Sequence, residues 1–197
     1  MTQPIAASTI VQQAFRALEL AAPSSFGDES PQAAAAAEQY PEALRMCLEV
    51  ADWSFASDIA ALPAAIPGTD VVADPDLPHA FVLPDSFVAL RQVYEADNWR
   101  IDRQFLRTDM SGPLRIRYTA LITDETRLPA WFRLAVALRL ASLVSPQWLG
   151  DVGKRDRIAQ DAEITMRQAL RMDARNASPK RWDGLDRQED WALGARL

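Results

Sequence analysis

The sequence predicts a mainly α fold: a four-helix antiparallel bundle with an inserted small antiparallel β-sheet region and an extended C-terminal tail. Two long amphipathic segments rich in Ala and Leu, 31–56 and 128–148, share a pattern although they lie far apart. A Pro-rich stretch with short alternating segments separates them, and helical periodicity ends after Ser178. The expected organisation is two helices (1–59), an irregular arm and sheet (60–127), two helices (128–178) and the tail (179–197).

The first predicted helix begins at Thr9, because Thr9 and Gln12 form a capping-box pattern. Pro23 marks the point where the chain can no longer be helical. The apolar positions between them recur at helical spacing and predict one buried face, made of Ile10, Ala14, Phe15, Leu18 and Ala21.

The second predicted helix starts after Ser30, with Pro31 at its first helical position. The alanines at 33–37 favour helix strongly. Pro41 lies inside the pattern, so we expect a kink or a split near Tyr40. Residues three and four apart predict the buried face, which comprises Tyr40, Leu44, Cys47, Ala51 and Phe55.

The middle of the chain predicts an irregular arm followed by a small sheet. Four prolines and Gly68 lie between residues 60 and 80, which disfavours regular structure there. Short alternating segments bounded by turn residues follow, and they predict strands at 80–83, 89–94, 99–101, 104–107 and 114–118. A sheet of this size is not stable alone, so we expect it to pack on the helices.

Two further helices are predicted after residue 128. One runs from about Pro129 to Trp148, and the other follows Gly150 or Gly153. Helical spacing predicts the core face of the first as Trp131, Leu134, Ala135, Leu138, Ala141 and Ser142. It predicts the face of the second as Ile158, Ala162, Thr165, Met166, Ala169 and Met172.

Charge is distributed unevenly along the chain. Residues 1–99 contain 14 acidic and 3 basic residues, a net of −11, whereas residues 100–197 contain 13 acidic and 18 basic residues, a net of +5. This asymmetry fits an electrostatic contact between subunits, and it fits equally two halves that neutralise each other within one fold. Specific binding of duplex DNA is less favoured, since the total charge is −6 and the arginines are scattered.

Two segments are candidate partner-binding sites. Arg167, Arg171 and Arg175 recur every four residues and form one row on the last helix, which is either a solvated face or a contact stripe for an acidic neighbour. The tail after Ser178 has an unusual apolar content for a purely solvating segment. It either folds back over the bundle or becomes ordered against a partner through Trp182, Leu185, Trp191, Leu193 and Leu197.

The sequence predicts no catalytic, cofactor-binding or metal-binding residues. His79 is the single histidine and has no Cys or His at ligand spacing. Asp74 and Asp76 lack the central Gly and closing Glu of a calcium loop. Charged residues interrupt the third helix at Arg133 and Arg139, and no charge-free run in it is long enough to span a bilayer, so we expect no membrane contact. Residues 1–6 show no signal-peptide pattern.

An ordered set of packing motifs remains. It consists of Tyr40-Pro41-Glu42-Ala43-Leu44-Arg45, Trp53-Ser54-Phe55-Ala56, Phe81-Val82-Leu83-Pro84-Asp85-Ser86-Phe87, Val93-Tyr94, Tyr118, Leu128-Pro129-Ala130-Trp131-Phe132, and Ala137-Leu138-Arg139-Leu140-Ala141 with Pro146. This order, over roughly residues 8–178, resembles the head–tail connector (adaptor) proteins of tailed bacteriophages, of the tail-tubular-protein-A type. It is most similar to the adaptor of a phage-derived gene transfer agent.

The resemblance implies a structural protein rather than an enzyme. It implies a homo-oligomeric ring of about twelve copies joined by heterologous contacts. The ring would bind the portal protein above and a stopper or tail protein below, and DNA would pass through its lumen. It also implies assembly in the bacterial cytoplasm and a place in the neck of the particle. The alternatives are a small helical scaffolding or regulatory protein and, less favoured, a particle-associated hydrolase.

Overall fold

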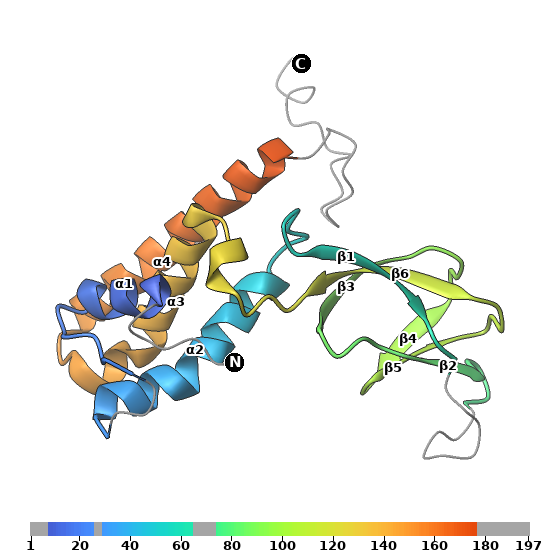
Figure 1. Cartoon of the computed structure of the whole chain (residues 1–197), viewed down its shortest axis with the longest axis horizontal. Helices are drawn as coiled ribbons and strands as arrows, with labels where there is room; N and C mark the ends of the chain where they lie inside the picture. Colours follow the sequence, from blue (N-terminus) through green and yellow to red (C-terminus); the bar gives the residue numbers. More distant parts are fainter. Residues whose placement is uncertain (1–7, 26–28, 65–73, 177–197) are drawn as a thin grey trace.

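The computed structural model describes residues 8–25, 29–64 and 74–176 of the 197. In this part the helices are α1 (Thr9–Ala17), α2 (Pro31–Glu49), α3 (Ala130–Trp148) and α4 (Val152–Asp173), with 3-10 turns η2 (Glu125–Arg127) and η3 (Ala174–Asn176). The strands are β1 (Ser57–Leu62), β2 (His79–Val82), β3 (Phe87–Val93), β4 (Trp99–Asp102), β5 (Phe105–Thr108) and β6 (Leu114–Ala120). The helices gather at one end of the molecule and the strands at the other (Figure 1).

The predicted mainly α four-helix bundle with one small inserted sheet is wrong. The described residues form an α/β mixture with two three-stranded antiparallel sheets, ordered β1-β6-β3 and β2-β5-β4. The error has two physical causes. The second helix ends at Glu49 instead of continuing through Phe55, and residues 57–62 form an edge strand whose mostly exposed side chains leave no clear pattern.

The helix starts follow side-chain capping. Ser8, not Thr9, caps α1, because its Oγ accepts a hydrogen bond from the backbone N–H of Val11 at 3.1 Å. The predicted cap of α2 is confirmed, since Ser30 Oγ accepts from the N–H of Ala33 at 3.2 Å. Pro41 does not split α2, which is a single helix over its 19 residues.

α3 is the central helix, with α1, α2 and α4 all packed against it. Its predicted core face is partly wrong: Trp131 is 40% exposed, whereas the next residue, Phe132, is 1% exposed. α3 is apolar over most of its circumference and has three helical neighbours, so spacing alone does not define one face. The predicted face of α4 is buried except at its last position, Met172, which is 39% exposed.

The strands have a hydrophobic core of their own, separate from the helical core. Fully buried side chains from both sheets meet there, including Phe81 of β2, Leu106 of β5, and Leu114 and Ile116 of β6. The chain after β1 also links the two sheets, because Pro63 O accepts from the N–H of Val82 at 3.1 Å and Ala64 bridges Phe81. This short link connects the β1 edge of one sheet to the β2 edge of the other.

Candidate assembly surfaces and the joint between the two regions

A joint between the helical and β regions forms at the loop that follows α2, residues 50–56. Arg91, on β3, donates from Nη2 to the carbonyl oxygens of Leu48, Glu49 and Ala51 at 3.3, 3.1 and 2.6 Å. Its Nε also donates to Thr119 Oγ1 on β6 at 2.8 Å. A cation at a helix C-terminus is favourable because the last carbonyls lack intrahelical partners and carry partial negative charge. Arg91 therefore fastens the end of α2 to the sheet.

Two further polar contacts hold the same loop. The buried carboxylate of Asp52 forms an ion pair with Arg117, on β6. Ser54 donates to the carboxylate of Asp173 at the end of α4, from its backbone N–H at 2.9 Å and from Oγ at 2.5 Å. Charge-assisted hydrogen bonds of this kind are roughly twice as strong as neutral ones. The loop thus connects the ends of α2 and α4 to β6.

Aromatic side chains fill the apolar side of the joint. Trp53 lies edge-on to Phe132 with ring centroids 4.9 Å apart, and Phe55 contacts the same Phe132 ring at 4.9 Å. Trp53 Nε1 donates to the carbonyl oxygen of Cys47 at 2.9 Å, so the indole is satisfied although buried. Burial also raises the pKa of the Cys47 thiol to about 12. Trp53 is thus buried against Phe132, whereas Trp131, which was predicted to lie on the core face of α3, is exposed.

A second polar cluster surrounds the buried carboxylate of Glu125, in the turn η2. Glu125 Oε1 accepts from Ser8 Oγ at 2.5 Å and from Tyr40 Oη at 2.8 Å. Burial, followed by the neighbouring Glu125 charge, raises the pKa of Tyr40 well above its ordinary value. This cluster ties the start of α1 and the middle of α2 to η2, which leads into α3, so it is structural in effect.

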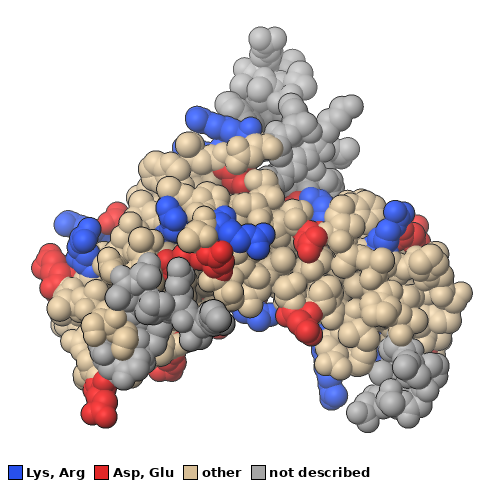
Figure 2. All heavy atoms as spheres, viewed as in Figure 1, with Lys and Arg blue, Asp and Glu red and all other residues tan. Residues whose placement is uncertain are grey.

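The predicted arginine row lies on the exposed face of α4 and η3. Arg167, Arg171 and Arg175 are all exposed, and none forms an ion pair or hydrogen bond with another described residue. Arg157 lies on the same face, because helical spacing places 157, 164, 167 and 171 on one side. Arg157 was not predicted from the sequence, because it is not one of the arginines that recur every four residues. Basic side chains gather over the end of α4 in Figure 2.

An acidic row lies on the outward face of α2. Glu38, Glu42 and Glu49 are exposed there, and Arg45 forms an ion pair with Glu49 at 3.4 Å. Glu38 and Glu42 have no ion pair within the described part of the chain. The exposed apolar side chains of Met46 and Val50 lie beside this row. The acidic row was not predicted from the sequence, because the net charge of residues 1–99 does not show which acids share a helix face.

The two halves of the chain neutralise each other only in part. Ion pairs join acids before residue 100 to bases at or after it at Glu19–Lys154, Asp52–Arg117, Asp74–Arg100 and Glu95–Arg115. Most of these pairs lie in the β region or at the joint. Within the described residues, the acidic row of α2 and the arginines of α4 take no part in these pairs.

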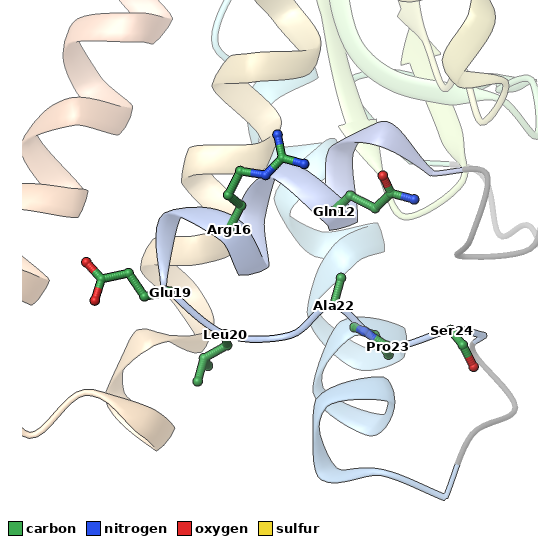
Figure 3. A pocket seen from close by; sticks show the side chains of 7 residues that line it. All are labelled: Gln12, Arg16, Glu19, Leu20, Ala22, Pro23 and Ser24. Carbon is green, nitrogen blue, oxygen red and sulfur yellow. The ribbon is translucent and has the colours of Figure 1, made fainter.

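The predicted partner-binding residues of the tail, Trp182, Leu185, Trp191, Leu193 and Leu197, lie outside the described residues. Hollows of the described surface show no site for a small molecule. Seven side chains around the end of α1 line an open depression of about 400 Å³, and Figure 3 shows that they diverge instead of converging on one point. A second hollow of about 370 Å³ lies beside the joint, between Phe55 and Arg127.

Within the described ranges, no group of three or more His, Cys, Asp or Glu residues is placed to hold a metal ion. None of the helices described has the length and apolar composition that crossing a bilayer requires. The fold and its surfaces define an α/β protein with two cores, a polar joint and opposite charge rows on two outward helix faces. No family model matches the chain, and a search of curated proteins found no match to it.

Proposed function

We propose that this protein is a structural head–tail adaptor that forms a ring beneath the portal of a phage-like particle. In this role it joins head to tail and leaves a channel through which DNA passes. The partners are further copies of the chain, the portal protein above, and a stopper or tail protein below. The particle neck is the location, after assembly in the bacterial cytoplasm.

One observation carries the proposal: two of the motifs on which the family resemblance depends, Trp53-Ser54-Phe55-Ala56 and Leu128-Pro129-Ala130-Trp131-Phe132, meet at the joint. Trp53 and Ser54 contact Phe132 and Asp173 there. Tyr118, on β6, hydrogen-bonds near the start of β1, since its Oη is 3.2 Å from Ser86 Oγ and 3.3 Å from Asp58 Oδ2. Segments far apart in sequence therefore share one structural task, which is to hold the helical region against the β region.

Such a joint suits a protein that connects two neighbours. An adaptor binds one neighbour on the head side and another on the tail side. Its helical and β regions must therefore be held together rigidly. Arg91, the Asp52–Arg117 pair and the Ser54–Asp173 bonds all restrain the same short loop. Hydrogen bonds to charged groups contribute about 1.5–3 kcal/mol each. The overall charge of −6 also suits a channel through which DNA slides without being held.

We assign portal binding to the C-terminal tail, residues 179–197. Two tryptophans, Trp182 and Trp191, are the kind of side chain that anchors protein interfaces. Ordering a segment costs conformational entropy, so contacts repeated around a ring favour binding more than one contact does. The arginines of α4 are a second surface for assembly.

The proposal is tested by mixing the full chain with the portal protein of its own locus and weighing the product by native mass spectrometry. We expect a complex that carries about twelve copies of the chain. A version ending at Ser178 should keep its circular dichroism spectrum and melting temperature but should no longer attach to the portal. A portal that stays bare with the full chain overturns the proposal and favours a small scaffolding or regulatory protein. If the shortened chain still binds the portal normally, the tail is not the portal-binding segment.

A further inference from the structure

We infer that the arginine stripe of α4 binds the acidic row of α2 in a second copy of this chain. The arginine stripe comprises Arg157, Arg167, Arg171 and Arg175, and the acidic row comprises Glu38, Glu42 and Glu49. The inference deepens the proposed function and rests on it for its biological role, because it names the contact between neighbours in the ring. Its physical basis is independent and lies in three features of the two helices.

The first feature is that each row carries mainly one sign of charge. Asp161, one helical turn beyond Arg157, is an exposed acid within the arginine stripe, and Glu163 pairs with Arg139 of α3 at 2.5 Å, but the stripe keeps an excess of positive charge. On α2, Arg45 lies within the acidic row and pairs with Glu49, whereas no ion pair joins Glu38 or Glu42 to another described residue. Each helix therefore presents a face of one predominant charge.

The second feature is matched spacing. Glu38 and Glu42 are four residues apart, as are Arg167, Arg171 and Arg175. Four residues of helix correspond to about 6 Å of rise, so consecutive acids can meet consecutive arginines when the helices lie side by side. Antiparallel packing that sets Arg171 against Glu42 also sets Arg175 against Glu38 and Ile164 near Glu49. The contact then includes apolar area from Ile164, which is 46% exposed, and from the neighbouring Met46.

The third feature is that one chain cannot make this contact with itself. α2 and α4 both bury one face against the helical core, and both rows lie on the opposite, outward faces. Figure 1 shows the two helices on different sides of α3. Pairing must therefore be between copies. Because the two surfaces differ, the contact is heterologous, and repeated heterologous contacts close into a ring when the rotation between copies allows it.

Exposed ion pairs are individually weak and are screened by salt. The contact should consequently be detectable at low ionic strength and high protein concentration, and should gain strength when many copies act together. Duplex DNA is the other polyanion that an arginine stripe attracts. The matched acidic row on the same chain favours a second copy, and DNA binding is an outcome that the experiment separates.

Charge exchange in the full chain tests the inference. One variant carries Arg171→Glu with Arg175→Glu, a second carries Glu38→Arg with Glu42→Arg, and a third carries all four changes. Self-association is measured by sedimentation at low salt and at about 0.5 M salt, where the Debye length is only a few ångströms. A matched control, Arg16→Glu with Arg103→Glu, reverses two exposed arginines elsewhere and reproduces the charge change of the first variant.

We expect each of the first two variants to associate at least about tenfold more weakly than the natural chain, since two attractive pairs become repulsive. The third variant, and an equimolar mixture of the first two, should regain association, while the control stays unchanged. Restoration also shows that the changed chains fold. Unchanged association in the single-face variants, failure of the exchange to restore it, or a chain that is monomeric throughout overturns the inference.

Duplex DNA is titrated in parallel to distinguish the second polyanion. Loss of DNA binding in the arginine variant together with unchanged self-association assigns the stripe to DNA and overturns the inference. The experiment also separates this inference from the proposed function. Portal rings that form normally with the single-face variants leave the adaptor role standing and refute only the contact. Self-association that follows the charge exchange without any binding to the portal supports the contact and refutes the adaptor role.

Discussion

The helical region and the β region bury apolar surface in different ways. The helical core draws on all four α-helices and also takes Val88 from β3 and Ile122 from the segment after β6. The β core is smaller and closes only because two sheets face each other, with Leu106 at its centre. Three or more strands with a covered apolar face are needed for stability in water. Each small sheet of the β region therefore covers the apolar face of the other, and a single small sheet would leave that face exposed.

The joint differs from both regions because polar contacts hold it. Arg91, the Asp52–Arg117 pair and the Ser54–Asp173 bonds surround one loop, and only the Trp53–Phe132 contact extends the helical core into it. Apolar packing tolerates substitution of similar volume, whereas a buried charge that loses its partner incurs a desolvation cost. The comparison predicts that the two cores and the joint respond differently to mutation.

The largest effect is expected in the helical core. Phe132→Ala should lower the free energy of unfolding by about 3–5 kcal/mol, because it removes a ring that contacts both Trp53 and Phe55. The matched control is Trp131→Ala, since that side chain is 40% exposed and should cost less than about 1 kcal/mol. Denaturant melts measure both values. Equal losses at the two positions would show that the aromatic cluster is not the centre of this core.

The next effect should be confined to the β region. Leu106→Ala leaves a cavity in the smaller core and should cost about 2–5 kcal/mol. If the cores are separate, hydrogen exchange should accelerate in β2, β5 and β4 while the amides of α3 keep most of their protection. Uniform acceleration in both regions would instead mean that they unfold as one cooperative unit.

A smaller effect is expected at the joint. Arg91→Met keeps much of the side-chain length but removes the donors to the last carbonyls of α2, and it should cost about 2 kcal/mol. Arg45→Met is the control, because its exposed pair with Glu49 contributes only about 0.3–0.5 kcal/mol. Thermal melts provide the comparison. If Arg91→Met lowers the melting temperature no more than Arg45→Met does, Arg91 does not stabilise the joint.

The smallest effect concerns acid. Hydrogen bonds from Arg100 hold the pKa of Asp74 at about 2 and lower that of Asp102, and both carboxylates lie in the β region. A lowered folded-state pKa adds stability above the unfolded-state pKa of about 4, and that stability is lost as pH falls through about 2. Melts of Arg100→Ala and the natural chain should therefore differ slightly at pH 5 and coincide near pH 2. An equal difference at both pH values would contradict the assignment.

The sequence predicted the helices better than the strands and their pairing. Ser30, Pro31 and the face of α4 followed from local capping and spacing rules, which act within a few residues. The division into two sheets depends on pairing between distant segments, such as β1 with β6, where Ser57 lies opposite Thr119, and no local pattern reveals such pairing. β1 was missed because an edge strand with exposed side chains shows little alternation.

The candidate surfaces show the same difference between local patterns, which the sequence reveals, and distant contacts, which it does not. The row Arg167, Arg171 and Arg175 was visible because helical spacing is a local property, and α4 presents it outward. Arg91, Arg117 and Asp173 were not anticipated, since each acts on a loop at least 40 residues away in the chain. The acidic row on α2 was hidden within the total charge of its half. Its significance depends on which face of α2 is buried.

Electron cryo-microscopy of the full chain mixed with the portal protein of its locus tests the adaptor role most directly. The account predicts a closed ring of about twelve copies beneath the portal, with an open centre and with α4 of each copy against α2 of the next. Portal particles that carry no ring, or that carry isolated copies without contact between neighbours, would contradict it.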